Sequence, residues 1–213
     1  MNSLHFTFCD TRCIALPSGA LHLPEHGILC VSDLHLGKSD RIARRSGVML
    51  PPYEMQATLQ KLEADIAQTR PSKVICLGDS FDDLHAATSL PEDILLWLAA
   101  MQAGREWVWI EGNHDPGPVN LGGVHLAELQ VGVLVFRHIA TDADAEISGH
   151  YHPKHSIAGR SRPAFLYDET RLIMPAYGAY TGGLRSTTPV LRNVFKKAPI
   201  AILTGRRAIA VPV

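Results

Sequence analysis

The sequence has almost no net charge and few cysteines, and both absences narrow the possible functions. Twenty basic and 21 acidic residues leave a formal charge of −1. No overall basic field would therefore attract nucleic acid, and such a partner would need a local patch or a metal. The four cysteines, at positions 9, 13, 30 and 76, form no CxxC pair. This pattern is typical of buried free thiols in a reducing compartment rather than of a disulfide framework.

Long apolar stretches are also missing. No run reaches the ~18 residues that a membrane span needs. The first segment, MNSLHFTFCDTRCIAL, lacks a basic start and contains Asp10 and Arg12, which is not typical of a signal peptide. We therefore expect a cytoplasmic protein without a membrane partner. The chain has 213 residues, 46% of them hydrophobic, so it can bury one core. We expect a single domain over residues 1–213.

The sequence does contain alternating strand-like and helix-like segments. Short apolar runs bounded by turn residues predict five buried strands. They cover residues 27–33, 73–79, 107–113, 131–138 and 145–150. Between the first two strands, four apolar residues fall on one helical face: Met55, Leu59, Leu62 and Ile66.

Two further features complete the predicted secondary structure. Pro51 and Pro52 mark the expected start of the first helix, and a second helix is expected over 91–104. Strands alternating with helices predict an α/β core. Residues 4–23 and 164–213 resemble β-hairpins instead, so strands should predominate at both ends.

Each predicted strand ends in a side chain that can bind a metal ion or move a proton. In open α/β sheets, ligands bind beyond the carboxyl ends of the strands, so these side chains should converge. Glycine precedes three of them, at positions 78, 112 and 149, and would leave room beside a bound ion or phosphate. The candidate metal ligands are Asp33, His35, Asp79, Asn113, His138, His150 and His152.

Seven ligands are too many for one tetrahedral ion and suit two ions if a carboxylate bridges them. Imidazole and oxygen ligands without cysteine suit Mn, Fe, Zn or Ni. Two such ions roughly 3.5–4 Å apart activate a water and clamp a phosphoryl group. A single motif of this kind could be a surface turn, but five at successive strand ends predict a two-metal phosphoesterase. We expect His155 to lie at the surface or behind the ligands, and the remaining histidines outside these motifs to be structural.

The motifs resemble those of the calcineurin-like metallophosphoesterases. The set comprises D-x-H at 33–35, GDxxD at 78–82, GNHD at 112–115, a lone His138 and GHxH at 149–152. The resemblance implies a four-layer αββα sandwich, in which two mixed β-sheets are flanked by helices. It assigns one metal to Asp33, His35 and His152, the other to Asn113, His138 and His150, with Asp79 as the bridge.

The same resemblance implies roles for three residues beside the metals. His114 would face the substrate and stabilise the transition state or protonate the leaving oxygen. Asp82, one turn beyond the bridging carboxylate, would orient the His114 imidazole. Asp115 would assist these two residues.

A narrower resemblance lies outside the metal motifs. Residues 33–54 and 174–184 look like those of the bacterial DNA-ligase-associated metallophosphoesterases, relatives of repair nucleases. This implies Mn-dependent cleavage of phosphodiester bonds in DNA, with a DNA ligase, a helicase and a second nuclease as repair partners. We therefore expect a repair-linked endonuclease that prefers single-stranded DNA. The chain departs from the group at GDSFDD (78–83), where a histidine is expected soon after the bridging aspartate.

Several residues near the motifs could bind a nucleic-acid strand. Arginines after the first and last metal loops could hold flanking phosphates, and two tyrosines in the glycine-rich AYGAYTGG could stack on unpaired bases. Solvated loop arginines and core tyrosines are the alternatives. The candidates are Arg41, Arg44, Arg45, Arg160, Arg162, Tyr177 and Tyr180.

Two other functions stay open. The first is a small-molecule phosphoesterase acting on a cyclic nucleotide, a nucleotide sugar or a phosphomonoester. Within it, His114 counts against the UDP-sugar hydrolases, which typically have arginine there, and Asp83 stands where protein phosphatases usually have arginine. The second is a non-catalytic scaffold of the same fold. Scaffolds of that kind lose ligands, whereas this sequence retains the full set.

Overall fold

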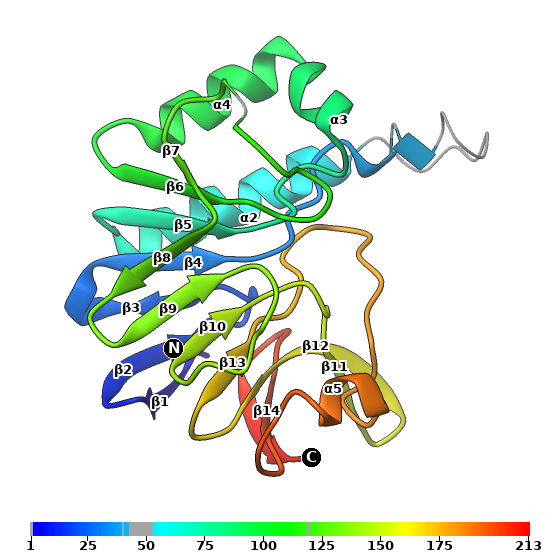
Figure 1. Ribbon diagram of the computed structural model, residues 1–213. Helices are drawn as coiled ribbons and strands as arrows, with labels where there is room; N and C mark the ends of the chain where they lie inside the picture. Colours follow the sequence, from blue (N-terminus) through cyan, green and yellow to red (C-terminus); the bar gives the residue numbers. More distant parts are fainter. Residues whose placement is uncertain (1, 40, 43–52, 119) are drawn as a thin grey trace.

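Two β-sheets stacked face to face form the centre of the molecule (Figure 1). The computed structural model describes residues 2–39, 41–42, 53–118 and 120–213. The first sheet has the strand order β1-β2-β3-β4-β5-β6-β7. Its strands are β1 (Leu4–Phe8), β2 (Thr11–Ala15), β3 (Leu21–Leu23), β4 (Ile28–Val31), β5 (Lys73–Leu77), β6 (Glu106–Ile110) and β7 (Val124–Leu126).

The second sheet has the order β15-β14-β12-β13-β10-β9-β8, with β11 paired to β12. Its strands are β8 (Glu128–Val131), β9 (Leu134–Arg137), β10 (Glu146–Ser148), β11 (Lys154–Ile157), β12 (Arg160–Tyr167), β13 (Arg171–Ile173), β14 (Ile200–Leu203) and β15 (Ile209–Pro212). Both sheets are mixed: β4 to β7 pair in parallel, as do β9, β10 and β13. The N-terminal and C-terminal hairpins are antiparallel, as predicted.

The described helices lie mainly outside the first sheet. They are a 3₁₀ turn η1 (Pro24–His26), α2 (Glu54–Thr69), α3 (Leu84–Thr88), α4 (Glu92–Gln102) and α5 (Pro189–Arg192). The predicted apolar face of α2 is buried, and the helix ends at Arg70, which has a left-handed conformation (φ 48°) and donates its N–H to the Ile66 carbonyl at 2.8 Å. The predicted start at Pro51 and Pro52 lies outside the described residues.

Three apolar interfaces separate four layers. Leu59 and Leu62 of α2 pack in one cluster with Trp109 of β6. Cys30 of β4 and Phe136 of β9 belong to the cluster between the sheets. Leu191 and Phe195, in and after α5, cover the outer face of the second sheet. The predicted αββα sandwich is confirmed, with the last layer reduced to α5 and its flanking chain.

The structure differs from one sequence prediction and agrees with another. The apolar segment 131–138 is not one strand, because a turn at Gly132 (φ 60°) and Val133 separates the end of β8 from β9. The four cysteines are free thiols, and three of them are buried. Within the part of the chain that the structure describes, no helix combines the length and apolarity required to cross a bilayer.

Candidate metal centre

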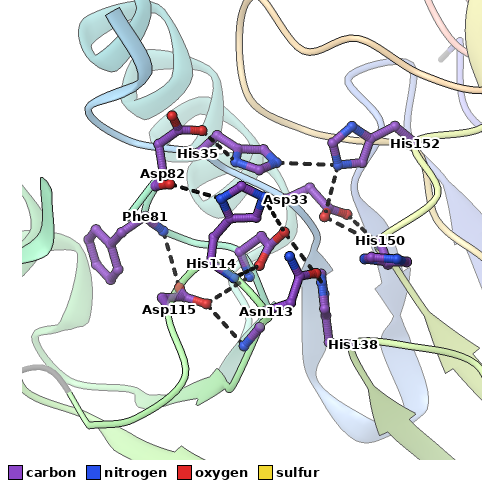
Figure 2. A network of polar contacts seen from close by, with 12 residues as sticks. Asp33, His35, Phe81, Asp82, Asn113, His114, Asp115, His138, His150 and His152 are labelled. Carbon is purple, nitrogen blue, oxygen red and sulfur yellow. Dashed lines mark hydrogen bonds and ion pairs between the residues drawn. The ribbon is translucent and has the colours of Figure 1, made fainter. Parts of the chain in front are cut away.

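The five predicted strand ends meet, but at the junction of two sheets rather than at the edge of one. Asp33, Asp79 and Asn113 follow β4, β5 and β6 of the first sheet. His138 and His150 follow β9 and β10 of the second sheet. The stacking of the sheets brings these loops together, and Figure 2 shows the labelled side chains, Asp33, Asn113, His138 and His150, pointing toward one another. The expectation of a single sheet edge was wrong, because apolar runs do not show which sheet a strand joins.

The first group of converging side chains consists of Asp33, His35 and His152, whose ligand atoms all lie within 4.8 Å of one another. Asp33 Oδ1 is 3.0 Å from His152 Nε2, and the Nε2 atoms of His35 and His152 are 3.3 Å apart. The Ser32 hydroxyl donates to Asp33 Oδ2 at 2.5 Å, which orients the carboxylate. Asp33 and His35 are buried and His152 is half-buried.

The second group consists of Asp79, His138 and His150, again within 4.8 Å. His138 Nε2 is 3.4 Å from Asp79 Oδ2 and 3.1 Å from Asn113 Oδ1, so Asn113 lies beside this group. Burial raises the pKa of Asp79, but His138 and the main-chain N–H of His114 outweigh it and lower the pKa to about 2. Asp79 is therefore an anion at neutral pH.

The donor chemistry of both groups fits a divalent cation. Nδ1 of His35 lies 2.9 Å from the Asp82 carboxylate, and Nδ1 of His138 lies 3.1 Å from the Leu77 carbonyl. These oxygens favour a proton on Nδ1, which leaves a lone pair on each Nε2. Each Nε2 then faces a further potential ligand atom, His152 Nε2 in one group and Asp79 Oδ2 in the other. Cations satisfy such clusters of lone pairs, and mixed nitrogen and oxygen ligands suit first-row transition metals.

Five of the seven candidate ligands have left-handed backbones. Their φ angles are 54° at Asp33, 47° at His35, 46° at Asp79, 70° at His150 and 46° at His152. This region is uncommon for residues other than glycine and costs about 1–3 kcal/mol at each position. Hydrogen bonds between the loops hold the conformation, such as His35 N–H to the Asp79 carbonyl at 2.9 Å.

The glycines before the ligands make room for neighbouring side chains. A Cβ at Gly78 would lie 2.3 Å from the His138 ring, and one at Gly149 would lie 1.9 Å from Ser32 Oγ. Gly112 is similarly close to Asp79. The sequence predicted space for an ion or phosphate at these positions, whereas the space is filled by the ligands and by the serine that orients Asp33.

His114 lies between the two groups and remains accessible. Its main-chain N–H donates to Asp79 Oδ1 at 2.9 Å, and its Nδ1 is 2.9 Å from the main-chain carbonyl of Asp82. Nε2 is 3.9 Å from Asp79 Oδ2, and the side chain is 32% exposed. Because a carbonyl can only accept, Nδ1 carries a proton and Nε2 is the nitrogen available to a substrate.

The Asp82 side chain contacts residues other than His114. Its buried carboxylate lies 2.9 Å from His35 Nδ1 and 3.9 Å from Lys38 Nζ, and it accepts from Arg41 Nε. The contact with His114 comes from the main chain, not from the carboxylate expected from the sequence. The Asp82 side chain therefore supports the first group of ligands.

Asp115 organises the loops around Asp79. Its carboxylate accepts main-chain N–H groups of Asp79, Ser80, Phe81 and Gly112 at 2.8 to 3.1 Å. Burial raises its pKa to about 6 and the nearby Asp79 charge adds to this, whereas the N–H groups lower it. The sequence predicted only an assisting role for Asp115, because the GNHD motif alone does not show that the carboxylate turns back onto the preceding loop.

The residues predicted to bind a nucleic-acid strand lie in several different parts of the structure. Arg41 contacts Asp82, and Arg44 and Arg45 lie outside the described residues. Arg160 and Arg162 lie on β12, in the hairpin with β11. Tyr180 is 49% exposed.

The predicted stacking role of Tyr177 is wrong. This side chain is fully buried and donates its hydroxyl to Asp65 Oδ2 at 2.7 Å, so no base can reach its ring. The alternative of a core tyrosine holds for Tyr177, because its segment is hydrogen-bonded to the loop that follows β4.

Comparison with known proteins agrees with this geometry. A model of the calcineurin-like phosphoesterase family matches residues 26–155, which is more than half of the chain. The chain belongs to the calcineurin-like phosphoesterase family. It is therefore a metal-dependent phosphoesterase, and the family uses divalent metals.

Solved structures extend the likeness beyond the matched region. This phosphoesterase resembles the nuclease MPE of Pseudomonas putida, with 25% identity, a TM-score of 0.79 and full coverage of both chains. A conserved uncharacterized protein from Streptococcus pneumoniae TIGR4 matches with 12% identity and a TM-score of 0.34, over 87% of this chain and 97% of the other. That second likeness is too weak to support a conclusion. No curated protein matches the sequence.

Proposed function

We propose that the protein is a two-metal phosphodiesterase that cleaves single-stranded DNA internally, with Mn²⁺ as the preferred metal. The observation that supports this most is the pair of ligand groups, Asp33, His35 and His152 beside Asp79, His138 and His150, with His114 accessible between them. The likeness to a nuclease over the full length of both chains supports a nucleic-acid substrate.

The roles of the residues follow from their contacts. When bound, two divalent ions would activate a water and neutralise phosphoryl charge. Asp79 would bridge the two groups, and Asn113 would join the second. With Nδ1–H directed to the Asp82 carbonyl, a protonated His114 would donate from Nε2 to the leaving oxygen.

The cellular assignment is part of the same proposal. The resemblance to DNA-ligase-associated metallophosphoesterases supports a role in DNA repair in the cytoplasm, alongside a ligase, a helicase and a second nuclease. Arg41, Arg160, Arg162 and Tyr180 remain candidates for strand binding, as do Arg44 and Arg45.

A small-molecule phosphoesterase is the second candidate, and one observation favours it. The two pockets beside the ligands are small, about 340 Å³ at His150 and His152 and about 440 Å³ at Asn113 and His138. Pockets of this size are common binding sites for small ligands.

Circular single-stranded DNA separates the two candidates, because a circle can become linear only by internal cleavage. The circle is incubated with Mn²⁺ and wild type, Asp79→Asn or Asp93→Asn, and a small chromogenic phosphodiester is tested in parallel. Asp93 is an exposed residue in the first turn of α4 and serves as the matched control.

We expect wild type and Asp93→Asn to linearise the circle, and Asp79→Asn to lose at least about a hundredfold in rate through loss of the bridging charge. An intact circle together with rapid hydrolysis of the small diester would replace the endonuclease proposal with the small-molecule one.

A further inference from the structure

Residues 174–186 connect the loop that carries Asp33 and His35 to the loop that carries His152, although they belong to no metal motif. Tyr177 N–H donates to the Ser32 carbonyl at 2.7 Å, and Gly178 N–H donates to the Asp33 carbonyl at 3.0 Å. In Figure 1 this segment is the orange loop that rises from β13 toward β4 and returns to α5. The first half is therefore fixed to the loop that carries Asp33 and His35.

The second half is fixed to the loop that carries His152. Lys154 N–H donates to the Leu184 carbonyl and Ser186 N–H to the Lys154 carbonyl, both at 2.8 Å. Gly183 lies so close that a Cβ would be 2.2 Å from the His152 carbonyl oxygen. His155, which was expected to lie at the surface or behind the ligands, holds Ser186 Oγ at 2.7 Å. The main chain at Leu184 is thus fixed beside the loop that carries His152.

This arrangement leaves an apolar recess against the ligands, which we call the Leu184 pocket. It has a volume of about 340 Å³. Leu184 and Val190 are 36% and 56% exposed, and exposed aliphatic groups that lie together commonly mark a binding surface. The pocket is lined by His150, Tyr151, His152, Gly183, Leu184 and Val190.

We propose that the Leu184 pocket holds an unpaired nucleobase next to the scissile phosphate. This inference rests on the proposed function, because a base arrives here only as part of a strand whose phosphate lies at the metal ligands. His150 and His152 belong both to the pocket and to the two ligand groups, so the pocket and the metal centre are continuous. Among the described residues, the lining contains no carboxylate, lysine or arginine.

An aliphatic and aromatic lining suits the flat face of a base rather than a phosphate or a sugar. The pocket lined by Asn113 and His138 is different, since Glu111, Glu128 and Arg137 also contribute to its lining. A nucleic-acid strand bound at the metal centre would therefore have one apolar pocket and one charged pocket within reach. A base in a duplex is stacked on both faces, so occupation of the Leu184 pocket requires an unpaired nucleotide, which gives the proposed preference for single strands a physical origin.

The test combines a protein variant with a change in the substrate. Short oligonucleotides carry one cleavable phosphodiester in an otherwise uncleavable backbone, and the nucleotides on both sides of it are either normal or abasic. The proteins are wild type, Leu184→Ser, Leu184→Met and Leu96→Ser. Leu96 is an exposed leucine on α4 and serves as the control.

We expect wild type to cleave the normal strand about tenfold faster in kcat/KM than the abasic strand, since stacking of one base has roughly this effect. Leu184→Ser should lose most of that preference, Leu184→Met should retain it, and Leu96→Ser should match wild type. Equal preferences in wild type and Leu184→Ser would overturn the proposal.

A second arm separates this proposal from the nuclease proposal. Hydrolysis of a small chromogenic phosphodiester is inhibited by a short uncleavable strand with or without bases. If wild type cleaves no oligonucleotide but hydrolyses the small diester, the nuclease proposal fails, and the inhibition still reports on the pocket. Tighter inhibition by the strand with bases, weakened about tenfold in Leu184→Ser, supports the pocket, whereas equal inhibition by both strands refutes it.

Discussion

Asp82→Asn distinguishes the two contacts that Asp82 makes. The substitution removes the negative charge beside His35, Lys38 and Arg41 but keeps the shape of the side chain. It also keeps the main-chain carbonyl, which is the atom that contacts His114. A loss that acts through His35 should therefore appear in metal affinity, and a loss that acts through His114 should appear in the chemical step.

The expected magnitude follows from the burial of the carboxylate. Asp82 is fully buried, and His35 Nδ1 lies 2.9 Å away, so the contact is little screened by water. A carboxylate that hydrogen-bonds to a metal-binding histidine changes metal affinity by about 10–100-fold, which corresponds to roughly 1.4–2.7 kcal/mol. We expect Asp82→Asn to weaken Mn²⁺ binding by this factor and to recover near-normal kcat when Mn²⁺ is saturating.

Activity measured across a Mn²⁺ titration gives both quantities, with Asp93→Asn as the control for the loss of one acidic group. A thermal melt of each variant checks that the fold survives. Unchanged metal affinity combined with a lower kcat at saturating Mn²⁺ would refute the reasoning, because it would show that Asp82 acts on His114 or on the substrate.

Two further predictions concern single side chains. His114→Gln should lower kcat on DNA by about 10²–10⁴-fold without changing the metal content. The loss of kcat on a nitrophenyl phosphodiester should be much smaller, because its leaving group needs no proton. Equal losses on both substrates would contradict the role of His114 as the acid. Burial lowers the pKa of Lys61 from an ordinary 10.5 to about 8, although the nearby Asp65 charge raises it. Between about pH 8 and pH 10.5 the unfolded chain therefore binds more protons than the folded chain. The free energy of unfolding of wild type should therefore rise relative to Lys61→Met as the pH increases from about 8 to above 10, and chemical denaturation at several pH values would show no such trend if Lys61 titrated normally.

The sequence predicted the strands and helices well because their signals are local. Apolar runs at β4, β5 and β6 are buried as continuous segments, and the periodic face of α2 faces the first sheet. The segment that became β8 and β9 was harder, because Gly132 within an apolar run permits either a bulge or a turn. The turn forms, and two antiparallel strands replace the expected one.

Contacts between residues far apart in the sequence were harder to predict. The order of ligands along the chain does not reveal that His138 and His150 follow strands of a different sheet from Asp33 and Asp79. The burial of Tyr177 depends on its contact with Asp65, which is 112 residues away in sequence. Such contacts depend on how the layers pack, and periodicity within one segment carries no information about that packing.

The division of ligands between the sheets has a consequence for the sandwich as a whole. The first group joins Asp33 and His35 from one sheet to His152 from the other, and the second group joins Asp79 to His138 and His150 in the same way. A cation held by either group would act as a cross-link between the two halves of the molecule. Metal binding and resistance to sliding of one sheet over the other would then be thermodynamically linked, so that a change deep in the core between the sheets could alter metal affinity without touching a ligand.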